Sequence, residues 1–328
     1  MRKIRTNKSE TESTNIDSDS KVSSNVFIVD ESNYFSRIDK FLRNALKNVP
    51  LSAIYKILRT GKVYINGKKA KEPSEKIEIG DRIEIRGEDV SKYNRDFKEL
   101  RPAKMKLNIL LEDEDIIVLN KPAGVSVHPG KFVNKPSLIE GLKYYGEKNG
   151  FEPFLVHRLD KDTSGVLIVA KNRQVARELS ELISSRDVEK VYIALVFGIV
   201  KPQRITLPVD GQEAVSVVSP INTFKSRLSS KAQDLTLLRV EIETGRKHQI
   251  RKHLAGIGAP IVCDNDYGDF RMNREFEKKY GLKRHFLHCN RMSFYFKGRY
   301  YNLEADVGDD LKHVLKVVES ENSRNPKR

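Results

Sequence analysis

The chain has 328 residues, long enough for two domains with at least one sizeable hydrophobic core. Lysine and arginine together number 60 against 45 aspartate and glutamate residues, so the formal charge is +15 and the pI is near 9.6. Such an excess favours a polyanionic partner, most commonly a nucleic acid, although total charge alone does not exclude a merely soluble basic protein.

Signals for a membrane, for secretion and for metal binding are missing from the sequence. No apolar run approaches the roughly 18 residues of a membrane span, and the N-terminus lacks the apolar core of a secretory signal. The two cysteines, Cys263 and Cys289, suit a reducing compartment. His248 and His253 are five residues apart and no CxxC accompanies them, so they form no metal-ligand pattern. We therefore expect a cytoplasmic protein with no membrane segment and no bound metal.

Composition divides the chain into five segments. Residues 1–24 are rich in Ser, Thr, Asn and charge and cannot bury enough apolar surface to offset the cost of ordering. We predict a disordered tail there, and a second one over residues 319–328. Residues 25–90 are predicted to form a small domain, residues 91–105 a polar linker, and residues 106–318 a larger domain.

The small domain carries clear signals for helices and strands. Apolar residues at helical spacing predict a helix over 38–46, and Ser52 is expected to cap a second helix. Asn66-Gly67 lies between strand-like runs, which is a strong hairpin signal. A further strand pair is expected at 77–79 and 83–85.

Positive charge gathers on the second helix and the hairpin of the small domain. Between Tyr34 and Val90 there are 13 basic residues against 8 acidic ones. A solvated polar face would explain this, but the clustering on one helix and its adjoining turn favours an RNA-binding surface. The residues expected to form it are Lys56, Arg59, Lys62, Lys68 and Lys69. The segment also resembles the alpha-L RNA-binding domain, through residues 37–42, 61–67 and 80–83, which implies RNA contact but no particular reaction.

The larger domain mixes strands and helices without a regular βαβ rhythm, so the sequence predicts an α+β fold rather than a doubly wound sheet. It opens with a strand, turn, strand and loop pattern over residues 109–124. Asn172 is expected to cap a helix, and strands are expected over 191–196 and 235–242.

The run HRLDKDTSG, residues 157–165, is a polar turn that enters a short apolar strand, and it admits three interpretations. Asp160, Asp162 and Ser164 alternate as in a calcium-binding loop, but the required glutamate at position twelve is replaced by Lys171. The second interpretation is structural, with Asp160 or Thr163 bonding to backbone donors of a tight turn. The third is catalytic, because a rigid turn before a strand holds its side chains in fixed positions.

The catalytic interpretation gains from a resemblance. HRLDKDTSG resembles the signature of the RluA-type pseudouridine synthases, which isomerise uridine in ribosomal and transfer RNA. Other segments that resemble this family follow in order, covering about residues 106–318: they begin at Asn120-Lys-Pro, Glu189-Lys-Val-Tyr, Thr244-Gly-Arg, Phe286-Leu-His and Ala305-Asp-Val. The resemblance implies a mixed, largely antiparallel sheet with flanking helices, and an isomerisation that needs no cofactor.

The resemblance also implies roles for single residues. Asp160 would be the catalytic carboxylate, Arg251 the arginine that pairs with it, and Tyr192 the tyrosine that packs on the target base. A guanidinium within reach keeps a carboxylate ionised, and an aromatic ring replaces the stacking that an extruded base loses. His157 is expected to be structural. Substrate contacts are expected from Arg158, Ile250, Lys121, Arg246 and Lys247.

An alpha-L domain joined to such a catalytic domain resembles the family members that modify large-subunit ribosomal RNA. The expected partner is therefore that RNA, and the expected state is a monomer. A synthase acting on tRNA, and a non-catalytic ribosome-binding protein that serves in assembly, are the alternatives. Intact Asp160, Tyr192 and Arg251 favour the enzyme, because a pure RNA binder has no need of a carboxylate that repels phosphate.

Overall fold

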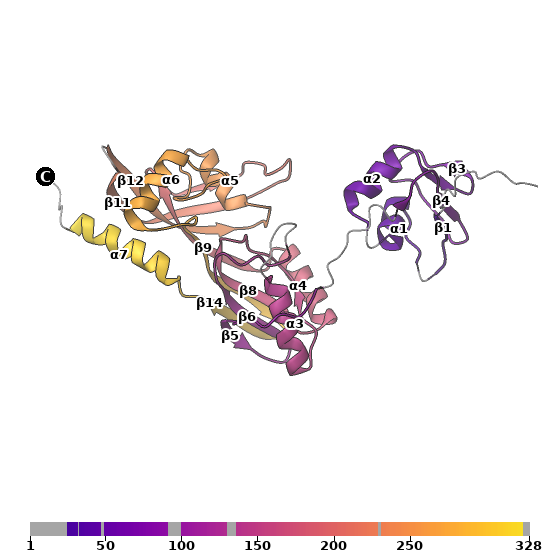
Figure 1. Cartoon of the computed structure of the whole chain (residues 1–328), viewed down its shortest axis with the longest axis horizontal. Helices are drawn as coiled ribbons and strands as arrows, with labels where there is room; N and C mark the ends of the chain where they lie inside the picture. Colours follow the sequence, from indigo (N-terminus) through magenta and orange to yellow (C-terminus); the bar gives the residue numbers. More distant parts are fainter. Residues whose placement is uncertain are drawn as a thin grey trace, which may run out of the picture. The chain divides into compact units, whose positions relative to one another are not determined.

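The computed structural model describes residues 25–31, 33–46, 49–90, 100–129, 136–228 and 231–323 (Figure 1). The chain divides into two compact units, residues 1–99 and residues 100–328. The predicted tail over 1–24 and most of the predicted linker lie outside the described residues. Of that linker, Ala103 donates its N–H to the Glu140 carbonyl and Met105 packs on the core of the second unit.

The N-terminal unit combines two helices with a four-stranded antiparallel sheet. The helices are α1 (Ile38–Ala45) and α2 (Leu51–Arg59). The strands lie in the order β1 (Asn25–Ile28), β4 (Arg82–Ile85), β2 (Val63–Ile65) and β3 (Lys68–Lys69). The apolar residues of α1 and α2 pack with those of β2 and β4 in one buried cluster, which explains why the helices form.

Two local predictions for this unit hold and two are wrong. The helix over 38–46 is confirmed, and so is the hairpin, where Asn66 and Gly67 have φ of 49° and 78°, as a type I′ turn requires. Pro50, not Ser52, precedes the first residue of α2. The segment 77–79 is not a strand, because the chain turns at its end while Ile77 enters the core.

The second unit is built on a ten-stranded sheet. Its main path runs β10, β11, β12, β9, β13, β8, β6 and β5, with β14 beside β13 and β7 beside β8. Among the strands that the structure describes in this unit, the junction of β13 with β8 is parallel and the other pairings are antiparallel. The predicted α+β class with a mixed, largely antiparallel sheet is therefore confirmed. The strand bounds are β5 Ile109–Glu112, β6 Ile116–Lys121, β7 Phe154–Leu155, β8 Ser164–Ala170, β9 Glu189–Phe197, β10 Gln203–Ile205, β11 Ser216–Leu228, β12 Lys231–Ile242, β13 Leu287–Phe296 and β14 Arg299–Glu304.

Helices flank both halves of this sheet. In Figure 1, α3 (Leu138–Asn149) and α4 (Arg173–Ser184) lie beside β5, β6 and β8, while α5 (Gln249–Gly256) and α6 (Phe270–Tyr280) lie beside β11 and β12. Asn172 accepts the Val175 N–H, as predicted for a cap. The loop before β8 belongs to the half of the sheet with β5, β6 and β8, and the start of α5 lies beside the half with β11 and β12. Strands β9 and β13 lie between these two halves.

The C-terminal helix α7 (Asp309–Ser323) packs against β11 and corrects the predicted tail over 319–328. Residues 319–323 are helical because polar side chains there find specific partners. Asn322 accepts the N–H of Lys225 and donates to its carbonyl, and Glu321 accepts from Tyr280 and Lys279. Such bonds order a segment that has too few apolar residues to order itself. Residues 324–328 lie outside the described residues.

Candidate active site

The turn that carries Asp160 is fixed by the strand that follows it. All seven residues of β8 are buried, and the Thr163 N–H donates to the Asp160 carbonyl. Gly165 has φ +117°, and a Cβ built there would lie 2.1 Å from the Cys289 carbonyl oxygen. Only glycine fits so close to another backbone at this φ. The turn therefore has its exit direction set by the parallel junction between β8 and β13.

Lys121 supports the same turn from below, so the predicted RNA contact of this residue is wrong. Its side chain is fully buried, and its ammonium donates to the carbonyls of Pro122, Val125 and Lys161 at 2.9, 2.9 and 3.0 Å. Burial lowers the pKa of Lys121 to about 7, against the opposing effect of the nearby Asp162 carboxylate. Lys121 ties the loop after β6 to the catalytic turn and cannot reach a phosphate.

A second set of contacts holds the turn from the start of β13. The Thr163 hydroxyl lies 2.8 Å from His285 Nε2, and the Ser164 hydroxyl lies 2.8 Å from His288 Nδ1. Arg284 donates to the Asp162 carbonyl at 3.2 Å. Burial lowers the pKa of His285 to about 3, so its ring is neutral. His157 is structural as predicted: its Nε2 accepts the Ile168 N–H at 2.9 Å, and burial lowers its pKa to about 3.

The guanidinium of Arg251, on α5, reaches Asp160 across the cleft, with 3.5 Å between Nη1 and Oδ2. Its shorter bonds go elsewhere: Nε and Nη2 each lie 2.7 Å from an oxygen of buried Asp264, and Nη2 lies 2.7 Å from Asp266. Burial opposes the charge on Arg251, but these two carboxylates outweigh it and raise the pKa of the guanidinium above its usual range. Arg251 is therefore a fixed cation, oriented from behind.

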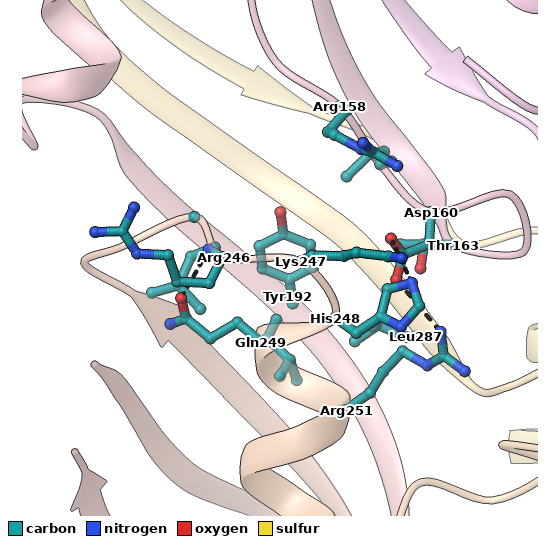
Figure 2. Close-up of a pocket in the computed structure, with 14 residues that line it drawn as sticks. Arg158, Asp160, Thr163, Tyr192, Arg246, Lys247, His248, Gln249, Arg251 and Leu287 are labelled. Atoms are coloured by element: carbon teal, nitrogen blue, oxygen red, sulfur yellow. Dashed lines mark hydrogen bonds and ion pairs between the residues drawn. The ribbon is translucent and has the colours of Figure 1, made fainter. Parts of the chain in front are cut away.

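Tyr192 lies in the middle of β9, opposite Cys289 of β13, and is 7% exposed. Burial raises the pKa of its phenol well above the usual value, so the hydroxyl stays protonated. Figure 2 shows its ring between the turn of Asp160 and the start of α5. Burial also raises the pKa of the neighbouring thiol of Cys289, and that of Cys263, to about 12.

These side chains line one cleft of about 310 Å³ (Figure 2). The cleft brings together most of the predicted site residues of the larger domain: Asp160, Tyr192, Arg251, Arg158, Ile250, Arg246 and Lys247. Arg158 is exposed, and no side chain of the described residues bonds its guanidinium. Arg246 donates to the Glu213 carbonyl at 3.1 Å. The wall between the Asp160 turn and α5 is thus apolar at Tyr192 and Ile250 and basic at the rim.

Three residues at this site were missed by the sequence analysis: His248, Asp264 and Tyr267. His248 Nε2 lies 3.6 Å from Asp160 Oδ1, and its Nδ1 lies 2.9 Å from the Tyr267 hydroxyl. A signal was present. Asp264 to Gly268 form a polar turn after the apolar pair Ile261-Val262, which mirrors the arrangement that singled out the turn of Asp160.

In the N-terminal unit, four of the five predicted RNA-binding residues are exposed: Lys56, Arg59, Lys68 and Lys69. Lys62 is half-buried, and its ammonium bonds to the Gly87 carbonyl and to Glu88. Within the part of the chain that the structure describes, no group of three or more His, Cys, Asp or Glu could hold a metal ion. Nor is any helix among the described residues long and apolar enough to cross a membrane.

Comparison with known proteins agrees with this architecture. Residues 115–256 match the RNA pseudouridylate synthase family, and residues 36–83 match the S4 domain. Ribosomal large subunit pseudouridine synthase C of Salmonella typhi is 38% identical over 302 residues, covering 87% of this chain and 93% of that protein. The protein of the same name from Escherichia coli K12 is 38% identical over 300 residues, covering 86% and 92%.

Solved structures show the same fold. Human RNA Pseudouridylate Synthase Domain Containing 4 is 25% identical with a TM-score of 0.50, covering 65% of this chain and 93% of that chain. Human RNA Pseudouridylate Synthase Domain Containing 1 is 20% identical with a TM-score of 0.51, covering 68% and 97%. With the extended similarity to the bacterial relatives, these matches establish that the chain belongs to the RNA pseudouridylate synthase family and carries an N-terminal S4 domain.

Proposed function

We propose that this pseudouridine synthase modifies uridines of large-subunit ribosomal RNA, with Asp160 as the catalytic carboxylate. The observation that carries the proposal is the placement of Asp160 at the cleft, with Arg251 3.5 Å away and Tyr192 in the same wall. The names of the relatives support the substrate class. They are ribosomal large subunit pseudouridine synthases, and the match covers about nine-tenths of their length.

The chemistry explains why a carboxylate is needed. The reaction breaks the bond between ribose and the base nitrogen and forms a new bond to ring carbon 5. Breaking that bond puts cationic character on the sugar, as glycoside hydrolysis does, and an adjacent carboxylate stabilises it. Among the described residues, none donates a hydrogen bond to the Asp160 carboxylate, because Arg251 and His248 stand at 3.5 and 3.6 Å. The carboxylate therefore lies at the cleft without a hydrogen bond from any described side chain before the substrate binds.

The cleft also suits an extruded base. The target uridine must leave its stack, which costs a few kcal/mol. Tyr192 and Ile250 provide an apolar surface for the base, and the exposed guanidinium of Arg158 can take the vacated space or hold a neighbouring phosphate. Arg246 and Lys247 contribute positive charge at the rim, where the RNA backbone passes.

The N-terminal unit supplies further affinity for the same RNA. Its exposed residues Lys56, Arg59, Lys68 and Lys69 act as phosphate contacts, and a second binding module on one chain raises the effective concentration of the substrate at the cleft. We infer that the chain acts as a monomer in the cytoplasm, where its two thiols stay reduced.

The test of Asp160 is release of tritium from RNA labelled at uridine carbon 5. Asp160→Asn keeps the size of the side chain and removes its charge, so release should fall by at least about a thousandfold while RNA affinity stays within about twofold. Release at the wild-type rate would remove Asp160 from the mechanism, and no release by the wild-type chain would favour a binding function alone.

The substrate is tested separately. Pseudouridines are mapped in ribosomal RNA and tRNA from cells with and without the gene, and from the deletion strain that expresses Asp160→Asn. We expect sites in large-subunit ribosomal RNA to disappear in the deletion and to stay absent with the variant. Loss of sites confined to tRNA would overturn the substrate while leaving the chemistry in place.

A further inference from the structure

We propose that His248, held by the Tyr267 hydroxyl, is a positioning residue that donates its Nε2–H to Asp160 and orients the catalytic carboxylate. The inference rests on the proposed role of Asp160 and adds a second group, opposite Arg251, to the same reaction. The family resemblance assigned no role to His248, although His248 lies in one of the matching segments, and the sequence analysis did not single out Tyr267.

The geometry assigns one partner to each carboxylate oxygen. Arg251 Nη1 faces Oδ2 at 3.5 Å, and His248 Nε2 faces Oδ1 at 3.6 Å. Arg251 lies in the first turn of α5 and His248 directly precedes that helix, so both side chains reach Asp160 from the same end of α5. These distances exceed a hydrogen bond, and such contacts commonly shorten when the substrate binds.

The ring orientation follows from the second contact of His248. Its Nδ1 lies 2.9 Å from the Tyr267 hydroxyl, and the two rings meet edge to face at 74°. If Nδ1 carried the proton, the lone pair of Nε2 would face a carboxylate oxygen, which is repulsive. If Nε2 carries the proton, Tyr267 donates to Nδ1 and both contacts are favourable. The tautomer with the proton on Nε2 is therefore the one that fits its surroundings.

The charge state of the ring matters as much as its tautomer. Burial lowers the pKa of His248, and the cations Arg251 and Lys247 lower it further, against the opposing effect of Asp160 and Asp266. The ring is therefore neutral near pH 7. A neutral donor orients Asp160 without adding a second positive charge beside it, so the carboxylate keeps its basicity and its nucleophilic character.

The position of His248 beside Asp160 requires an unfavourable backbone conformation. The residue precedes α5 with φ +56°, a left-handed conformation that residues other than glycine adopt rarely and asparagine and histidine adopt more readily. Gln249 holds the conformation, because its side chain accepts from the Thr244 hydroxyl and from the Arg246 N–H and donates to the Val215 carbonyl. Strain retained by such bonds at a cleft points to a functional placement.

The test compares two amides of different length. His248→Gln can carry an N–H to the position of Nε2, whereas His248→Asn suits the left-handed backbone but its amide is too short to reach. We expect kcat for tritium release to fall about a hundredfold in His248→Asn and to recover to within about tenfold of wild type in His248→Gln. RNA affinity should change by less than about twofold in both.

Tyr267→Phe tests the relay without touching the backbone of His248. It keeps the ring and removes the donor to Nδ1, so we expect kcat to fall about tenfold and the acid limb of the pH profile to move upward, because the ring then protonates more readily. His313→Asn, an exposed histidine of α7, is the matched control and should behave as wild type.

Three outcomes would overturn the proposal: equal losses in His248→Asn and His248→Gln, losses confined to KM and RNA affinity, or wild-type kcat in Tyr267→Phe. The Asp160→Asn result separates these outcomes from failure of the proposed function. If Asp160→Asn is inactive while His248→Asn is fully active, only the positioning role falls.

Discussion

Charged side chains on the buried underside of the catalytic turn are hydrogen-bonded, whereas those of the turn that face the cleft are not. Below, Lys121 and Arg284 are buried and donate to carbonyls of the loop and the turn. Above, Arg158 and Asp160 form no side-chain hydrogen bond with any described residue. Hydrogen bonds below the turn hold its backbone in place, so the Asp160 carboxylate and the Arg158 guanidinium above it can be left without hydrogen bonds until RNA binds.

The sharpest way to break this contrast is to remove the buried cation. Lys121→Met keeps the length of the side chain but leaves three carbonyls without a donor, each costing about 1–3 kcal/mol. We expect a fall in thermal stability of several degrees and loss of most tritium release, followed by circular dichroism and activity assays. An unchanged melting temperature together with wild-type activity would show that the turn does not depend on Lys121.

Acid should destabilise the folded protein through its buried histidines. The folded protein holds His157 and His285 neutral, because burial lowers the pKa of each to about 3 from the ordinary value of about 6.5. The unfolded chain therefore binds more protons below pH 6.5, and stability falls as the pH drops from there toward 3, by up to about 1.4 kcal/mol per pH unit for each histidine. Urea unfolding at pH 7, 6 and 5 measures this slope.

A variant separates the histidines from general acid effects. His157→Gln retains an acceptor for the Ile168 N–H but does not titrate, so its slope between pH 6.5 and 5 should be shallower than that of wild type. Equal slopes in the two proteins would contradict the assignment.

The same substitution at the rim should give a different result. Lys247→Met removes a cation that lines the cleft, so we expect weaker RNA binding and an unchanged melting temperature. The slope of log affinity against log salt concentration should become smaller in magnitude by about one. Affinity measured between 50 and 200 mM salt gives the slope. A stability loss comparable to that of Lys121→Met would remove the distinction between the two regions.

The smallest effect on RNA binding is expected in the N-terminal unit. Near the end of α2, one basic side chain is bonded within the protein and another is exposed. Lys62 bonds to Glu88 and to the Gly87 carbonyl, whereas Arg59 is exposed. Arg59→Ala should weaken RNA binding severalfold, and Lys62→Ala should weaken it less. Titration of labelled RNA with each variant measures the difference, and a larger loss for Lys62→Ala would reverse this ranking.

The sequence predicted the catalytic residues better than it predicted the residues that hold them in place. Short motifs whose residue types are tied to the reaction contain Asp160, Tyr192 and Arg251. The family resemblance therefore assigned these residues to one site before the structure showed their positions. Lys121 was misread because burial depends on packing of the loop after β6 with the turn, which no local pattern reports. Asp264 and Tyr267 were missed because they act only through contacts made across the fold.

The elements followed the same rule. Apolar periodicity and the Asn66-Gly67 turn predicted α1 and the hairpin, because those signals are local. The last turn of α7 escaped prediction because its order comes from Asn322 and Glu321 bonding to distant β11 and α6. The parallel junction of β8 with β13 likewise needs Gly165, whose significance appears only beside Cys289.

The two cysteines have a practical consequence. The whole sequence contains only Cys263 and Cys289, and both are buried with a pKa of about 12, so almost no thiolate forms at neutral pH. Alkylating and disulfide-forming reagents should therefore spare the native chain. A cysteine introduced at an exposed rim position such as Arg158 would be the sole reactive handle, which makes this protein ready for site-directed crosslinking to its RNA without first removing any native thiol.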